Sequence, residues 1–204
     1  MAYKTEQEQF WAGEFGMEYQ QRNVGEGLLS SNVALFTRVL AATRGVKSVL
    51  ELGCNIGNNL IALNRINKEL ALTAYEINEA AAAKAAALNV GKVVCGTVIE
   101  PLPASETYDL TYTKGVLIHI NPDELTKVYD NLVRLSKRYV MVSEYYNPTP
   151  VTVNYRGNND RLFKRDFAGE LMDRHGPRLV DYGFMYHRDP NFPMDVAIWF
   201  LLEK

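Results

Sequence analysis

The stretch SVLELGCNIGNNL, from Ser48 to Leu60, opens with an apolar run that ends near Glu51 and then turns through two glycines into polar residues. This order is typical of the first strand, turn and helix of an open α/β sheet, where ligands bind beyond the carboxyl ends of the strands. A carboxylate beside the turn disfavours a pyrophosphate and favours a ligand that carries positive charge. We therefore expect a binding site for a cationic group at this turn.

From residue 46 onward, short β-branched runs alternate with helical stretches, which is the pattern of βαβ units around a parallel sheet. The pattern predicts strands at 48–52, 71–76, 92–95, 108–113, 139–145, 178–185 and 196–203, and helices at 58–67, 78–88, 122–134 and 164–174. We therefore predict an α/β fold with a Rossmann-like, doubly wound, mostly parallel seven-stranded sheet over residues 46–204.

Two segments fall outside this alternation. Within residues 1–45, Trp11, Phe15 and Tyr19 are spaced by four, which predicts a helical face and an N-terminal cap or lid over the domain. Residues 146–163 are rich in Pro, Asn and Gly, and we expect a long loop that is either functional or disordered.

The overall composition narrows the possible functions. With 47% hydrophobic and 23% charged residues in 204, the chain suits one globular domain, and its net charge of -2 gives no general attraction for nucleic acid or an anionic membrane. The two cysteines, Cys54 and Cys95, form no CxxC pair, so neither a disulfide framework nor a metal site is expected. The polar N-terminus and the absence of a long apolar run predict a cytoplasmic protein without a membrane span.

The turn differs from the GxGxxG fingerprint of dinucleotide-binding proteins, because Asn55 replaces the second glycine and Asn59 lies near the third. The next strand ends in Glu76, 76 − 57 = 19 residues after Gly57, close to the spacing of about 20 at which a carboxylate accepts ribose hydroxyls. S-adenosylmethionine meets these demands, since it carries a sulfonium, an ammonium and an adenosine but no phosphate. A solvated strand-end carboxylate is the alternative for both Glu51 and Glu76.

Through residues 45–145 the sequence resembles the class I S-adenosylmethionine-dependent methyltransferases. VLELGCNIGNN is similar to their first motif, AYEIN to the second, DLTYTKGVLIHINPDEL to the fourth, and RYVMVSEYYNP to the fifth strand. The third motif departs from the pattern, because Gly96-Thr97-Val98 stands where many members place an acidic residue against the adenine amine. Beside Glu51 and Glu76, the resemblance implies cofactor-binding roles for Gly53, Cys54, Asn55, Gly57, Asn58, Ile77, Thr97, Val98, Lys114 and Gly115. Tyr19 and Arg22 belong to the N-terminal cap, where their polar ends could reach the cofactor's carboxylate, and ordinary packing of an aromatic helix face is an equal alternative.

Over nearly the whole chain, the sequence also resembles the methylases associated with pseudaminic acid biosynthesis. This narrower resemblance rests on TEQEQFWAGEFGMEYQQRN, EYYNPTPVTVNYRG, LFKRDFAGELMDR and LVDYGFMYHRDPNFPMDVAIWFLLEK. It implies a small-molecule acceptor, a sugar or sugar nucleotide linked to nonulosonic acids, methylated at oxygen or nitrogen.

Three residues on the ligand side of the predicted sheet are candidates for catalysis. His119 follows the fourth strand and could act as a general base, and Glu144 and Tyr145 end the fifth strand. Packing beneath the NPDEL helix is an equal alternative for His119, and a strand-end charge with a packed ring is the alternative for the other two. His175 and His187 have no partner pattern and are expected to be structural or on the surface.

A basic cluster lies near the presumed mouth for the acceptor. Arginine offers paired donors to a sugar carboxylate or a nucleotide phosphate, whereas a solvated face paired with Asp160 and Asp166 is the alternative. The predicted substrate-binding residues are Tyr155, Arg156, Lys164 and Arg165.

Three other functions remain open at this point. A nicotinamide-dependent reductase is disfavoured by Asn55, by Glu51 and by the lack of a Tyr-x-x-x-Lys pair. A catalytically silent protein that binds the cofactor and regulates a partner is a second possibility, and an RNA methyltransferase is a third, disfavoured by the near-neutral charge.

Overall fold

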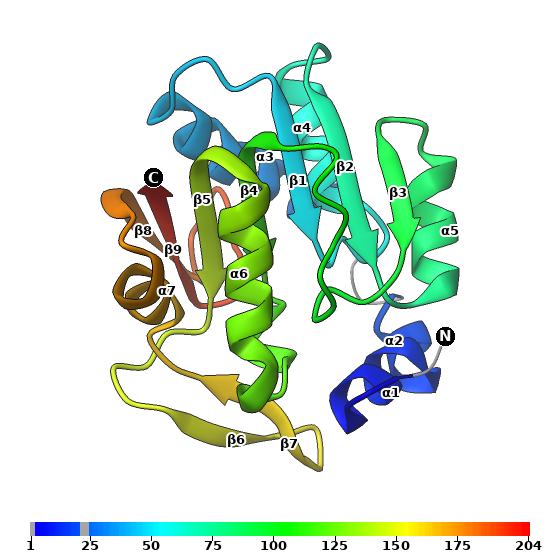
Figure 1. Ribbon diagram of the computed structural model, residues 1–204. Helices are drawn as coiled ribbons and strands as arrows, with labels where there is room; N and C mark the ends of the chain where they lie inside the picture. The colour runs from blue at the N-terminus through cyan, green and yellow to red at the C-terminus, as the bar shows by residue number, and fades with distance from the viewer. Residues whose placement is uncertain (1–2, 21–24) are drawn as a thin grey trace.

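The computed structural model describes residues 3–20 and 25–204, and it confirms the predicted fold class. Seven strands form one sheet in the order β3-β2-β1-β4-β5-β9-β8 (Figure 1). The first five run parallel, and β9 is antiparallel to both of its neighbours. Their bounds are β1 Ser48–Leu52, β2 Ala71–Glu76, β3 Lys92–Cys95, β4 Tyr108–Lys114, β5 Ser136–Glu144, β8 Arg178–Met185 and β9 Ala197–Glu203.

Helices cover both faces of the sheet, which explains why its strands are apolar on both sides. Successive residues of β1 point to opposite faces, so Val49 joins one core cluster and Leu50 the other. The helices and short 3-10 turns on these faces are α3 Glu26–Ala41, α4 Asn58–Ile66, α5 Glu79–Ala87, η1 Leu117–His119, η2 Pro122–Glu124, α6 Leu125–Leu135 and α7 Phe167–His175.

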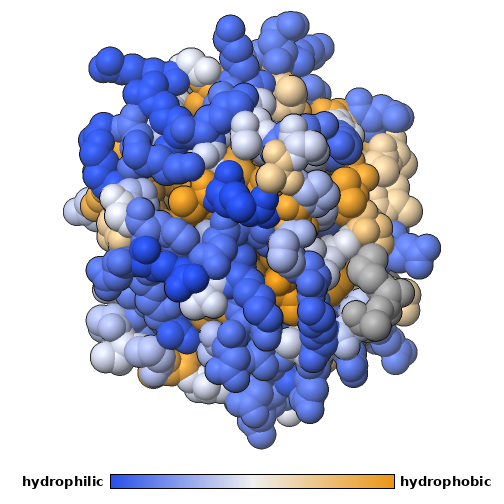
Figure 2. All heavy atoms as spheres, in the orientation of Figure 1, coloured by the Kyte–Doolittle hydropathy of each residue, from blue (hydrophilic) through white to orange (hydrophobic). Residues whose placement is uncertain are grey.

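Helix α6 shows how sequence periodicity sets this packing. Its buried apolar residues recur at helical spacing and face the sheet, and they are Leu125, Val128, Tyr129, Leu132 and Leu135. Hydrophilic side chains cover most of the face seen in Figure 2, with apolar residues showing between them. No described helix is long and apolar enough to cross a membrane.

The N-terminal segment divides into two parts. Helices α1, Glu6–Ala12, and α2, Glu14–Gln20, lie beyond the carboxyl ends of β1, β2 and β3 (Figure 1). Helix α3 instead packs beside α4, and its Phe36 and Val39 are fully buried in the core. Of the expected cap over residues 1–45, only α1 and α2 therefore cover the end of the sheet. Helix α3 belongs to the core of the domain.

The prediction of a loop over residues 146–163 is wrong for most of that segment. Strands β6, Val151–Tyr155, and β7, Asn158–Lys164, form a separate antiparallel hairpin at the same end of the molecule as α1 (Figure 1). Arg156 and Gly157 form its turn at φ values of 51° and 82°, a two-residue turn whose twist matches the strands. The alternating Val151 and Val153 favour a strand more strongly than the nearby Pro and Asn favour a loop.

The helix predicted at 164–174 begins later than expected. Lys164 ends β7, and the Asp166 side chain caps the helix by accepting a hydrogen bond from the Gly169 amide at 2.8 Å. This shift places Lys164 on the hairpin.

Candidate active site

A cavity of about 690 Å³ lies beyond the carboxyl ends of the central strands. The turn after β1, the ends of β2, β4 and β5, helices α1 and α2, and the hairpin form its walls. Most of the predicted site residues share this one cavity, and they are Tyr19, Gly53, Cys54, Asn55, Asn58, Glu76, Ile77, Thr97, Val98, Lys114, Gly115, His119, Tyr145, Tyr155 and Arg156.

The turn after β1 needs left-handed backbone at three positions. Gly53, Asn55 and Gly57 have φ values of 86°, 48° and 87°. A Cβ at Gly53 would lie 2.5 Å from the Val116 Cγ2 atom, so a side chain there would be both strained and crowded. Gly57 begins α4 and does not line the cavity.

The backbone amides of this turn are already used within the protein. Those of Gly53 and Cys54 donate to the Tyr75 carbonyl at 2.8 and 3.1 Å, and that of Gly57 donates to the Cys54 carbonyl at 2.9 Å. The Asn55 amide donates to a Glu76 carboxylate oxygen at 2.7 Å. Four amides of this turn are therefore not free to bind a pyrophosphate, which disfavours a dinucleotide here.

Glu76 lies at the end of β2 in the cavity wall, as its spacing predicts. One of its carboxylate oxygens accepts from Asn55 and the other from the Asn78 amide at 2.8 Å. Burial raises the pKa of this carboxyl, although these hydrogen bonds favour the charged form. Since each carboxylate oxygen can accept a second hydrogen bond, Glu76 retains the capacity to bind two ribose hydroxyls.

Glu51 does not line the cavity, contrary to the direct contact that its position in the sequence suggests. It is fully buried beneath the turn, and its Oε1 atom accepts from the Asn59 side-chain amide at 2.6 Å. Burial raises the pKa of Glu51 to about 7, while the nearby Lys114 ammonium favours its charged form. Lys114 lines the cavity and Glu51 does not, so Glu51 can influence a ligand only indirectly, through its charge and through its contacts with residues of the cavity wall.

His119 lies in η1 and faces the cavity. Its Nδ1 atom is 2.7 Å from the Arg161 carbonyl oxygen. Because a carbonyl only accepts, Nδ1 carries the proton of the neutral ring, and Nε2 holds a lone pair. Burial lowers the pKa of His119 to about 4, so the ring is neutral near pH 7. Trp11 of α1 packs on the ring with 4.3 Å between centroids, whereas the packing alternative placed His119 beneath the NPDEL helix. The role of His119 as a general base stays a prediction.

Glu144 is buried and does not line the cavity. Its carboxylate accepts hydrogen bonds from the backbone amides at the start of η1, those of Val116, Leu117 and Ile118, at 3.1, 3.2 and 3.4 Å. Burial raises the pKa of Glu144 to about 7. The carboxyl thus holds the turn that carries His119 and does not face a ligand.

Tyr145, the next residue, lines the cavity, and its hydroxyl donates to an Asp195 carboxylate oxygen at 3.3 Å. Burial raises the pKa of Tyr145, which keeps the hydroxyl protonated.

Burial also raises the pKa of the Cys54 thiol, so this cysteine is no thiolate nucleophile.

The basic cluster divides in the structure. Tyr155 and Arg156 line the cavity at the hairpin tip, whereas Lys164 and Arg165 do not. The Lys164 ammonium lies 5.5 Å from the centre of the Tyr145 ring, and Arg165 pairs with Glu170 at 2.6 Å. Arg22 lies outside the described residues.

Several cavity residues have no site role that the sequence predicts, because their local patterns do not mark them as ligand-binding residues. They are Glu8, Asn32, Asn121, Asp195 and His187, the last of which was expected to be only structural or on the surface. Helix α1 reaches across the cavity between two walls. The Gln7 side chain donates to the Asp160 carbonyl at 2.9 Å, and the Asn78 side chain donates to the Ala12 carbonyl at 3.1 Å.

Comparisons with known proteins agree with this geometry. Residues 49–138 match the family model of a methyltransferase domain. The magnesium protoporphyrin IX methyltransferase of Synechocystis PCC 6803, solved with S-adenosylhomocysteine, is similar in structure with a TM-score of 0.72 at 15% identity over 97% of each chain. An S-adenosylmethionine-dependent methyltransferase from Leishmania major gives 0.72 at 15% identity, over 98% of this chain and 87% of that one. No curated protein sequence matches.

The domain match and the fold together indicate a class I S-adenosylmethionine-dependent methyltransferase. The predicted enzyme class and cofactor are thereby confirmed, with S-adenosylhomocysteine as the product. Neither comparison connects the chain with pseudaminic acid.

Proposed function

We propose that this enzyme methylates an oxygen or nitrogen atom of a sugar or sugar nucleotide that binds between His119, Tyr145 and the β6–β7 hairpin. The observation that carries the proposal is the neutral imidazole of His119, which faces the cavity with Nδ1 held by the Arg161 carbonyl at 2.7 Å. When bound, S-adenosylmethionine supplies a methyl group on a positively charged sulfur.

The residues of the turn fit this cofactor better than a phosphate-bearing one. Four of the turn amides are bonded within the protein, and each oxygen of the Glu76 carboxylate in the cavity wall can accept one more hydrogen bond. In the proposed site Glu76 binds the ribose, and Gly53, Lys114 and Gly115 lie along the methionine half.

In this proposal His119 Nε2 takes the proton from an acceptor hydroxyl as the new bond forms at that oxygen. The imidazolium that results is stabilised through its Nδ1–H bond to the Arg161 carbonyl. Glu144 holds the η1 backbone and thereby fixes the position of the ring. An amine acceptor would need only orientation of its lone pair before it reacts.

The acceptor wall supports a sugar in two ways. Trp11, Tyr145 and Tyr155 offer aromatic faces to the apolar side of a sugar ring, and Arg156 offers paired donors for a carboxylate or phosphate. The narrower assignment to a nonulosonic acid or its precursor rests on the sequence resemblance alone.

Transfer of a labelled methyl group tests the proposal. The protein is incubated with methyl-labelled cofactor and a panel of nucleotide sugars and nonulosonic acids, and products are identified by mass spectrometry. We expect a labelled sugar product that increases with enzyme concentration. Label on RNA alone, or tight S-adenosylhomocysteine binding without label on any acceptor of a cell extract, would contradict the sugar assignment.

A further inference from the structure

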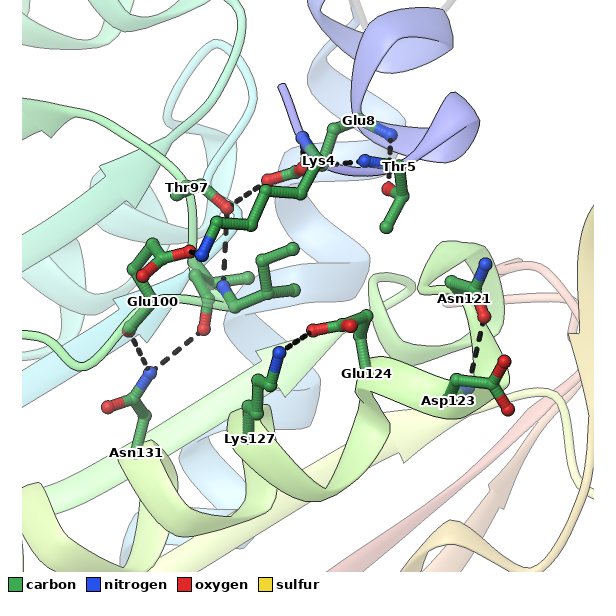
Figure 3. Close-up of polar contacts among 12 residues, drawn as sticks. Lys4, Thr5, Glu8, Thr97, Glu100, Asn121, Asp123, Glu124, Lys127 and Asn131 are labelled. Carbon is green, nitrogen blue, oxygen red and sulfur yellow. Dashed lines mark hydrogen bonds and ion pairs between the residues drawn. The ribbon is translucent and has the colours of Figure 1, made fainter. Parts of the chain in front are cut away.

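The carboxylate of Glu8 on α1 lies in the cavity wall at the end of β3, although it is a helix residue near the N-terminus. Only 6% of Glu8 is exposed, whereas the side chain of Glu6 on the same helix is 79% exposed. One Glu8 oxygen accepts from the Thr97 hydroxyl, and the other accepts from the amides of Lys4 and Thr5 at 2.8 and 3.2 Å (Figure 3). The capping box of α1 therefore fixes this carboxylate in place.

Glu8 lies beside the residues that follow β3, the strand next to the one that Glu76 ends. Glu76 ends β2, and residues 96–99 follow β3, which pairs with β2. Neighbouring strands of a sheet lie roughly 4.8 Å apart. A nucleoside whose ribose binds Glu76 extends its base toward these residues. Apolar side chains suited to a flat ring line this part of the cavity, and they are Ile77, Val98, Ile99 and Ile118.

Residues 96–99 contain no acidic side chain, and the other carboxylates in the described cavity wall are committed elsewhere. Glu76 lies at the ribose position, and Asp195 accepts from Tyr145. An ionised carboxylate only accepts hydrogen bonds, and the Oε1 atom that accepts from Thr97 has room for a second donor.

We propose that Glu8 accepts a hydrogen bond from the exocyclic amine of the cofactor's adenine, so that helix α1 distinguishes adenine from other bases. This inference rests on the assigned cofactor. It also makes α1 bind more firmly over the cavity once the adenosine is in place, because the same carboxylate contacts the base, Thr97 and the start of the helix.

Calorimetric binding of two product analogues tests the inference. S-adenosylhomocysteine carries the amine, and S-inosylhomocysteine carries a carbonyl oxygen in its place, which a carboxylate repels. We expect the native protein to prefer S-adenosylhomocysteine by at least about tenfold. In Glu8→Gln the amide can donate to that carbonyl, so the preference should fall by at least about fivefold.

Glu8→Gln is suited to this test because glutamine is also accepted at the third position of a capping box. The ratio of the two affinities does not depend on the fraction of protein that is folded. Glu6→Gln is the matched control, since it makes the same change at an exposed position of the same helix, and its ratio should equal that of the native protein.

A native preference that Glu8→Gln leaves unchanged would overturn the role of Glu8 and leave the cofactor assignment intact. Failure of the native protein to bind either analogue would overturn both. A fall in the ratio for Glu6→Gln equal to that for Glu8→Gln would also contradict the inference, because the effect would then come from the charge of the helix.

Discussion

Most residues of the proposed cofactor half of the cavity come from one stretch, residues 48–115, and Glu8 joins them from α1, whereas the proposed acceptor half combines segments that lie far apart in the sequence. In the first half, backbone groups bond to each other, as Gly53 does to Tyr75. In the second half, Trp11 packs on His119, and the Gln7 side chain bonds to Asp160, 153 residues away. Local motifs can specify the first half, but only the completed fold assembles the second.

The largest effect should come from the centre of the acceptor half. His119→Gln removes the only imidazole Nε2 that we assign as a base, so we expect kcat to fall at least about 100-fold while S-adenosylhomocysteine affinity stays within about twofold. Steady-state kinetics with the acceptor that the labelling experiment identifies measure kcat, and calorimetry measures the affinity for S-adenosylhomocysteine. His175→Gln is the matched control, because His175 ends α7 outside the cavity, with its Nε2 atom 3.0 Å from Asp130 of α6. Unchanged kcat would leave His119 with a packing role alone.

Protonation of His119 on unfolding should make stability depend on pH. Its pKa is about 4 in the folded protein and roughly 6.5 when unfolded, so the unfolded chain binds more protons between these values. The free energy of unfolding should therefore rise with pH from about 4 to about 6.5, by up to roughly 3 kcal/mol from this residue. Urea titrations of the native protein and His119→Gln measure the difference, and parallel pH curves would contradict it.

Glu51, beneath the cofactor half, should show the opposite dependence. Its folded pKa of about 7 exceeds the unfolded value of roughly 4.3, so the folded state binds more protons and loses stability as pH rises from about 4.5 to about 7. Glu51→Gln can keep a hydrogen bond to Asn59 and should remove this loss of up to roughly 4 kcal/mol. The difference in free energy of unfolding between Glu51→Gln and the native protein should be larger at pH 7.5 than at pH 5. An equal difference at both pH values would contradict the raised pKa of Glu51.

In the cofactor half, Glu76→Ala should weaken S-adenosylhomocysteine binding by at least about tenfold, roughly 1.4 kcal/mol, because a charge-assisted contact to the ribose is lost. Glu79→Ala is the control, because Glu79 is an exposed residue at the start of α5, and this variant should bind S-adenosylhomocysteine as the native protein does. Calorimetry gives both constants. An unchanged affinity for Glu76→Ala would remove this carboxylate from the site.

The smallest effect should come from a single tether of α1. Gln7→Ala removes hydrogen bonds to the Asp160 carbonyl and to Asn121, so we expect the free energy of unfolding to fall by about 1 kcal/mol. Exposed Gln9 on the same helix provides the control Gln9→Ala. If both variants unfold at the same urea concentration, the tether contributes nothing measurable.

The same contrast explains what the sequence could predict. Alternating apolar runs located the seven strands, and the spacing of Glu76 from the glycine turn placed it in the cavity wall. The Asn and Gly residues of the hairpin indicate a loop, so local patterns do not reveal it, although Arg156-Gly157 lies as a two-residue turn between two strands.

Burial of the predicted carboxylates could not be read from local patterns. β1 is covered on both faces, so its alternation does not say whether Glu51 faces the cavity or the interior. Its hydrogen-bond partner Asn59 comes from the next helix, and Glu144 bonds to amides of a turn 26 to 28 residues away. The role of Glu8 depends in the same way on Thr97, 89 residues away.

The strands of the β6–β7 hairpin pair only with each other and add no strand to the seven-stranded sheet. An insertion or exchange at its tip therefore alters one wall of the cavity while the register of the sheet and the glycine turn stay as they are. Exchange of Arg156 and Gly157 at the tip can thus change the proposed acceptor wall while Asp160 and Arg161, whose carbonyls bond to Gln7 and His119, stay as they are.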